Sequence, residues 1–154
     1  MTTSLTVAEL AESGERTLGT SSWHVVDQER IDRFAEATGD DQWIHVDRAR
    51  AAQGPFGTTV AHGYLTLSLL PIMLRETISL SDARMVVNYG SERIRFTSPV
   101  PSGSRVRVHA TLRSSEPRGG GILYRTGVEI EIEGQERPAL VGEVLGLAFG
   151  GDDA

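Results

Sequence analysis

The sequence predicts an α+β fold, in which a curved antiparallel sheet wraps around one central helix. The segment 61–77 is apolar nearly all round, as expected of a helix that is buried on every side. After residue 85 the pattern changes to segments in which apolar and polar residues alternate, separated by glycine-rich turns, which is typical of antiparallel strands. The 154 residues are enough for about one domain, so we expect a single domain over 1–154.

The first half of the chain carries clear helix-boundary signals. Residues 1–20 are polar and rich in Thr, Ser and Glu, and we expect a peripheral segment there; residues 150–154 are expected to form a frayed tail. Residues 22–26 alternate as a short strand. Asp27 is placed to cap a helix that ends at Gly39, and Asp47 to cap a short helix within 46–52. Pro71 is expected to kink the central helix or to end its first part.

The second half is predicted to form the sheet. Strand candidates are residues 85–89, 92–96, 105–112, 123–132 and 140–149, and the reversals between them include 98–103, 119–121 and 133–135. The simplest packing buries the apolar faces of these strands against the central helix.

Composition excludes several kinds of protein. There is no cysteine, which rules out disulfides, thiolate metal sites and cysteine nucleophiles. All fifteen basic residues are arginine, so lysine chemistry is excluded as well, and the net charge of −6 argues against general nucleic-acid binding. Neither a leader-like segment nor an apolar run of about 18 residues is present, which predicts a cytoplasmic protein that does not enter membranes.

An acid and an imidazole mark the candidate catalytic site. Asp40 and His45 lie five positions apart, directly after Gly39, and such a pair can carry out general acid–base chemistry. His62 and Gly63 then open the apolar helix, where a backbone N–H could stabilise a developing negative charge. No metal is expected, because Asp40, His45 and Asp47 lack a convincing further ligand. Neither a Gly-x-Ser-x-Gly turn nor a phosphate-binding loop ahead of a helix is found.

Three segments resemble one known family. Residues 39–45, Gly-Asp-Asp-Gln-Trp-Ile-His, are similar to the signature Gly-Asp-x-Asn-Pro-(aliphatic)-His of the MaoC-like dehydratases and R-specific enoyl-CoA hydratases, with Gln42 and Trp43 replacing Asn and Pro. Residues 61–65 resemble the His-Gly start of that family's central helix. Tyr89-Gly90, together with residues 95–100, resembles its first long hairpin. The resemblance covers about residues 22–149 and implies the hot-dog fold.

The resemblance implies reversible hydration of trans-2-enoyl-CoA to (R)-3-hydroxyacyl-CoA. Asp40 and His45 would hold one water between them, and which of the two is the base stays open. Gly63 would offer its backbone N–H to the thioester oxygen. A homodimer enclosing an apolar tunnel for the acyl chain is expected, with acyl-CoA as the substrate and with no cofactor.

Four further residues are candidates for substrate binding: His62, Ser68, Tyr89 and Gly90. His62 either orients the catalytic loop through a hydrogen bond or takes part directly. Ser68 either bonds back to its own helix or supports the floor of the pocket.

Three other functions stay open at this point. An acyl-CoA thioesterase on the same fold would need a carboxylate aimed at the carbonyl carbon. A dehydratase of carrier-protein-bound acyl chains would differ in partner and not in chemistry. A non-catalytic acyl-CoA-binding subunit would have no use for both Asp40 and His45.

Overall fold

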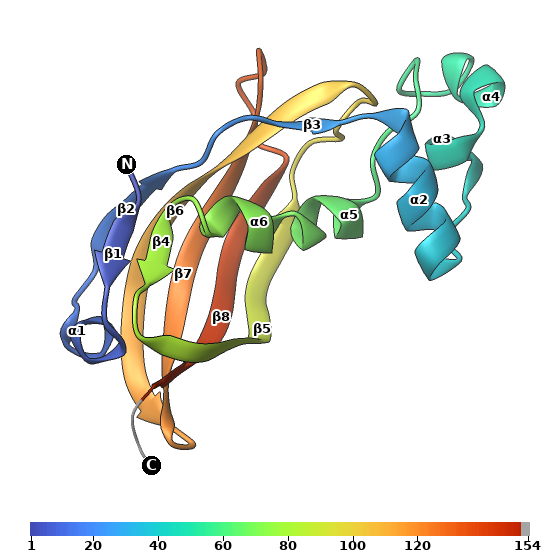
Figure 1. Ribbon diagram of the computed structural model, residues 1–154. Helices are drawn as coiled ribbons and strands as arrows, with labels where there is room; N and C mark the ends of the chain where they lie inside the picture. Colours follow the sequence, from blue (N-terminus) through green and yellow to red (C-terminus); the bar gives the residue numbers. More distant parts are fainter. Residues whose placement is uncertain (152–154) are drawn as a thin grey trace.

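One large antiparallel sheet dominates the computed structural model, which describes residues 1–151 (Figure 1). Its strands follow the order β2-β6-β7-β8-β5, and β3 pairs with β6 beside β2; β1 and β4 form a separate parallel pair. The strands are β1 (Thr3–Leu5), β2 (Arg16–Thr20), β3 (His24–Val26), β4 (Ile78–Leu80), β5 (Ala83–Phe96), β6 (Ser104–Arg118), β7 (Gly121–Ile132) and β8 (Leu140–Gly150). The helices are α1 (Val7–Glu12), α2 (Gln28–Thr38), α3 (Trp43–Val46), α4 (Arg48–Ala52), α5 (Gly63–Ser68) and α6 (Leu70–Leu74).

The alternation in β6 and β7 separates a buried face from a charged one. The apolar residues of one face are buried: Val106, Val108, Ala110 and Leu112 on β6, and Val128, Ile130 and Ile132 on β7. On the opposite face the two strands form cross-strand ion pairs, among them Arg107 with Glu131 at 2.7 Å. The period-two pattern therefore sets which side of the sheet receives the helices.

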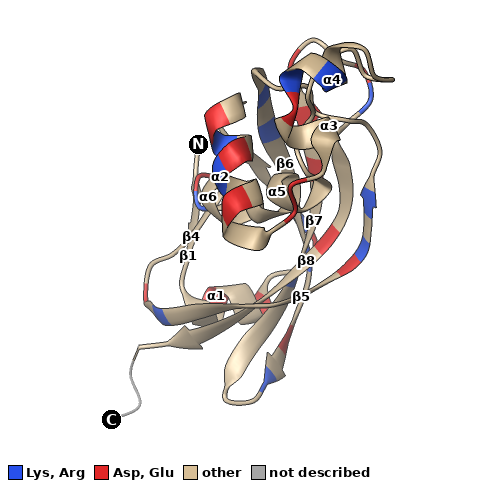
Figure 2. Ribbon diagram, turned by 90° about the vertical axis from the view of Figure 1, so that its right-hand side faces the viewer, with Lys and Arg blue, Asp and Glu red and all other residues tan. Residues whose placement is uncertain are grey.

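The predicted central helix forms as two short helices, α5 and α6, with Pro71 in the first turn of α6. They lie across the buried face of the sheet (Figure 1), and Leu65, Leu70 and Met73 pack into the core. Neither helix carries a charged residue (Figure 2). The prediction of burial on every side is nevertheless wrong, because the residues that the structure describes cover only the sheet side: Tyr64 is 68 % exposed and Ile72 is 42 % exposed.

The prediction that residues 1–20 are peripheral is also wrong. Leu5, Leu10 and Leu18 are buried in a second apolar cluster, together with Leu112 and Ala148 of the main sheet. The segment is held there because β1 pairs in parallel with β4. At the other end of the chain β8 extends to Gly150, and residues 152–154 of the predicted tail lie outside the described residues. None of the described helices is long and apolar enough to cross a bilayer.

Candidate active site

Asp40 follows directly after the end of α2. Asp27 caps the start of this helix by accepting from the Arg30 N–H at 2.9 Å. At the other end Gly39 adopts a left-handed conformation with φ of 78°, and its N–H donates to the Ala35 carbonyl. Both ends of α2 are therefore as predicted, and the glycine turns the chain so that Asp40 leaves the helix with its side chain exposed.

His45 lies in the short helix α3 and is only 7 % exposed. Its Nδ1 is 2.6 Å from the Val60 carbonyl oxygen. Because a carbonyl oxygen only accepts hydrogen bonds, Nδ1 must carry the proton, and in the neutral ring Nε2 then has the free lone pair. The backbone contact thus selects the tautomer in which Nε2 can act as a base.

Two polar residues that the sequence analysis missed hold this helix in place. The Gln28 side-chain amide donates to the His45 carbonyl oxygen at 2.7 Å, and its oxygen accepts from the Thr59 hydroxyl at 2.5 Å. Gln28 and Thr59 are both buried. A signal was available, since Gln28 lies three and seven positions before Ile31 and Ala35, on the buried face of α2. A polar residue on such a face needs buried hydrogen-bond partners.

Burial favours the neutral form of His45. It lowers the pKa of the imidazole below the ordinary value of 6.5, and nearby His62 adds to this decrease. The Val60 carbonyl and the Asp40 carboxylate act in the opposite direction. His45 is therefore a neutral ring at pH 7, available to accept a proton.

His62 completes a cluster with the predicted pair. Its ring stacks on the His45 ring with centroids 3.9 Å apart, and its Nε2 is 2.8 Å from the Asp40 carbonyl oxygen. One potential ligand atom from each of Asp40, His45 and His62 lies within 4.8 Å of the others. His62 is thus a potential ligand beside Asp40 and His45 that the sequence argument did not consider, and the absence of a metal stays a prediction.

Gly63 is the first residue of α5, where its N–H has no acceptor within the helix. The packing of β5 gives one reason for a glycine at this position. A Cβ atom there would come within 2.8 Å of the Phe96 ring, so Gly63 gives room to a side chain of β5.

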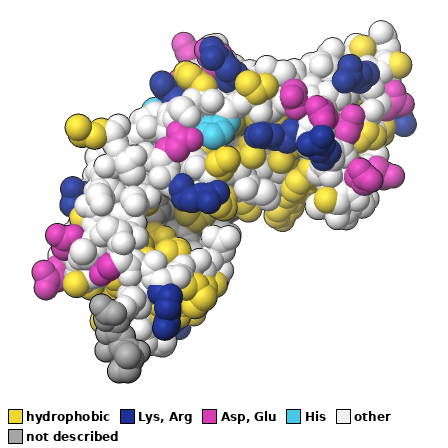
Figure 3. Space-filling view, viewed as in Figure 1, with side chains coloured by type: hydrophobic (Ala, Val, Ile, Leu, Met, Phe, Trp, Pro, Cys, Tyr) yellow, Lys and Arg dark blue, Asp and Glu magenta, His cyan; other side chains and the backbone are white. Residues whose placement is uncertain are grey.

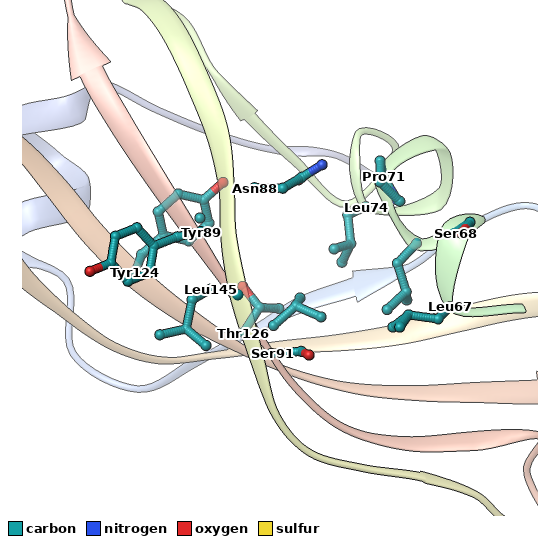
Figure 4. A pocket seen from close by; sticks show the side chains of 14 residues that line it. Leu67, Ser68, Pro71, Leu74, Asn88, Tyr89, Ser91, Tyr124, Thr126 and Leu145 are labelled. Carbon is teal, nitrogen blue, oxygen red and sulfur yellow. The ribbon is translucent and has the colours of Figure 1, made fainter. Parts of the chain in front are cut away.

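The other predicted binding residues line a cavity of about 320 Å³ between α5–α6 and the sheet (Figure 4). Ser68, Tyr89 and Gly90 belong to its wall, together with leucines of both helices and Tyr124 and Thr126 of β7. Ser68 also donates to the Tyr64 carbonyl at 2.6 Å, so both of its alternative roles are compatible with its position. His62 is not part of this wall and lies with Asp40 and His45 instead.

Comparison with known proteins places this fold and site in a class. Residues 9–133 match the MaoC like domain. The chain is 45 % identical over 146 residues to 3-hydroxyacyl-thioester dehydratase Z of Mycobacterium tuberculosis, covering 94 % of this chain and 97 % of that protein. It is 47 % identical over 139 residues to nodulation protein N of Rhizobium leguminosarum bv. viciae, covering 88 % and 86 %.

A solved structure agrees in fold. An unliganded R-hydratase from Pseudomonas aeruginosa superposes with a TM-score of 0.76 at 21 % identity, over 94 % of this chain and 86 % of that one. The protein is therefore an enzyme with the hot-dog fold, of the hydro-lyase class. More particularly, the chain belongs to the MaoC-like dehydratase family, which confirms the predicted fold and family.

Proposed function

We propose that the protein catalyses the reversible hydration of trans-2-enoyl-CoA to (R)-3-hydroxyacyl-CoA. The observation that carries this proposal is the Asp40–His45 pair, with a carboxylate oxygen and a ring nitrogen within 4.8 Å of each other. The name of the mycobacterial relative, 3-hydroxyacyl-thioester dehydratase Z, supports the same substrate class and the reverse direction. The R configuration rests on the resemblance of residues 39–45 to the family signature.

The spacing of the pair suits one water molecule. A water oxygen about 2.8 Å from each of two groups spans up to roughly 5.6 Å, which accommodates the 4.8 Å limit found here. Both the Asp40 carboxylate and the neutral His45 ring can accept hydrogen bonds from it. When the water oxygen bonds to C3 of the enoyl thioester, one of these acceptors takes its proton. The pair then returns a proton to C2, so that H and OH add across the double bond.

The negative charge that develops on the thioester oxygen needs a donor. We assign this role to the Gly63 N–H, which is free of intrahelical bonding at the start of α5. One such donor typically contributes about 3 kcal/mol of transition-state stabilisation. The cavity lined by Leu67, Leu70 and Leu74 of the two helices is the proposed site of the acyl chain, because its wall is mostly apolar.

One assay tests this function against its alternatives. The purified protein is given a short trans-2-enoyl-CoA, and the products are separated by chiral chromatography while free thiol is measured in parallel. We expect (R)-3-hydroxyacyl-CoA and no free CoA. Free CoA would instead indicate a thioesterase, and the absence of both products would indicate a binding subunit. The same acyl chain on an acyl-carrier protein, compared by kcat/KM, decides between the two carriers.

We also propose that the enzyme is a homodimer formed through β5. This strand is an edge of the sheet, and its backbone can pair with an identical strand across a two-fold axis. Five large apolar side chains on it are exposed: Met85, Val86, Val87, Tyr89 and Phe96. Figure 3 shows hydrophobic side chains on the surface in the region of β5 and α5. A second copy would cover these side chains and the exposed face of α5–α6, and light scattering would detect the dimer.

A further inference from the structure

His62 is a buried histidine that the proposed reaction does not itself use. It is 1 % exposed, at the residue before α5, and its ring contacts the rings of His45 and Phe34. Its Nε2 donates to the Asp40 carbonyl at 2.8 Å. Its Nδ1 is buried and has no hydrogen-bond partner among the described residues.

We propose that His62 is a positioning residue, which joins the Asp40 segment to the His45 ring so that both reach the same water. The inference rests on the proposed hydratase function and assigns His62 no contact with substrate. It replaces the expectation that His62 binds substrate.

The contact to Asp40 matters because little else fixes that residue. The Asp40 side chain is exposed, and its own N–H reaches only the Thr38 hydroxyl, at 3.4 Å. The 2.8 Å bond from His62 is the shorter of these two contacts to its backbone, and it spans 22 positions of the chain. Loss of this bond would free the carboxylate to move relative to His45, and a displacement of about 1 Å at a reacting group can cost roughly 100-fold in rate.

The contact to His45 has an electrostatic consequence. The titratable groups that act on the His45 ring are His62, which lowers its pKa, and Asp40, which raises it. The other side chains that support the ring's segment, Gln28 and Thr59, are uncharged. The stacked His62 ring thus disfavours protonation of His45, which keeps His45 in the form that the reaction needs.

Two substitutions of His62 distinguish a positioning role from a general contribution to the stability of the fold. The amide nitrogen of glutamine takes roughly the place of a histidine Nε2, whereas that of asparagine takes the place of Nδ1. His62→Gln therefore keeps the donor to the Asp40 carbonyl, and His62→Asn, which is equally polar and neutral, loses it. On a short 2-enoyl-CoA at pH 8, we expect kcat within about threefold of wild type for His62→Gln and a decrease of roughly 10–100-fold for His62→Asn. KM should change little in either variant.

Three results would overturn the inference: equal kcat in both variants, a loss expressed in KM instead of kcat, or parallel losses of kcat and melting temperature. The pH profile of kcat/KM is a second readout. Both variants lack the second imidazole, so the acid limb should move to higher pH in both, and an unchanged limb would contradict the coupling. NMR titration of the His45 ring without substrate measures the same shift. The NMR titration tests the effect of His62 on His45 even if the wild-type enzyme hydrates no enoyl-CoA. That result would contradict only the proposed function.

Discussion

The proposed catalytic cluster and the β5 edge differ in how many of their contacts come from the same chain. At the cluster, His45 is buried, its Nδ1 is bonded to Val60 and its carbonyl is bonded to Gln28. At the edge, Val86 is 47 % exposed, and among the strands of residues 1–151 β5 has a neighbour on only one side. The proposed catalytic cluster is thus held by contacts within the chain, whereas the side of the sheet beside the proposed acyl cavity is left uncovered by the described residues. Substitutions in the two regions should therefore fail in different ways.

The largest effect is expected at the catalytic pair. Asp40→Asn and His45→Gln each remove a proton acceptor, and we expect kcat to fall about 10³-fold in both. His45→Asn is the matched variant, since its amide nitrogen can still donate to the Val60 carbonyl while no base replaces Nε2. It should be as inactive as His45→Gln but closer to wild type in its free energy of unfolding. Near-normal turnover in any of the three would remove that residue from the mechanism.

Substitutions at the β5 edge should change the oligomeric state of the protein. Val86→Arg would place an unpaired charge in the proposed interface, which costs roughly 3–5 kcal/mol and raises the dimer Kd by about 10²–10⁴-fold. Val25 on β3 is equally exposed, at 48 % against 47 % for Val86, but lies away from β5, so Val25→Arg is the control. Light scattering across a concentration series should show dissociation for Val86→Arg alone. A stable dimer in that variant would place the interface elsewhere.

A smaller loss is expected at the point where the two regions meet. In Gly63→Ala the new methyl group must displace Phe96, because it would come within 2.8 Å of the ring. The N–H donor itself is kept, so the loss of kcat should be about tenfold, through a shifted α5. Phe96→Ala removes the ring that the new methyl group would meet. The variant with both substitutions should therefore keep most of the activity of Phe96→Ala alone. A double variant as impaired as Gly63→Ala would show that Phe96 is not the cause.

The sequence predicted those features that depend on neighbours along the chain. The caps Asp27 and Gly39, the strand alternation and the Asp40–His45 pair all lie within short segments whose signals are local. The features it missed depend on distant pairings. The Thr59–Gln28 bond joins residues 31 positions apart, and the burial of Leu5 depends on the pairing of β1 with β4. The error at Tyr64 has another origin. An apolar helix face predicts burial, but the sequence does not say whether the same chain or a second one buries it.

The smallest effect expected is a pH dependence at His45. In the folded protein its pKa lies below 6.5, mainly because of burial, whereas in the unfolded chain it returns to about 6.5. Below pH 6.5 the unfolded state therefore binds more protons, and the free energy of unfolding should decrease as the pH falls, by at most about 1.4 kcal/mol per pH unit, until the folded pKa is reached. His45→Asn lacks this titration. Denaturant unfolding of both proteins between pH 5 and 8 should show wild type losing stability relative to the variant on the acid side. Parallel curves would mean that burial does not lower the pKa of His45 in the folded protein.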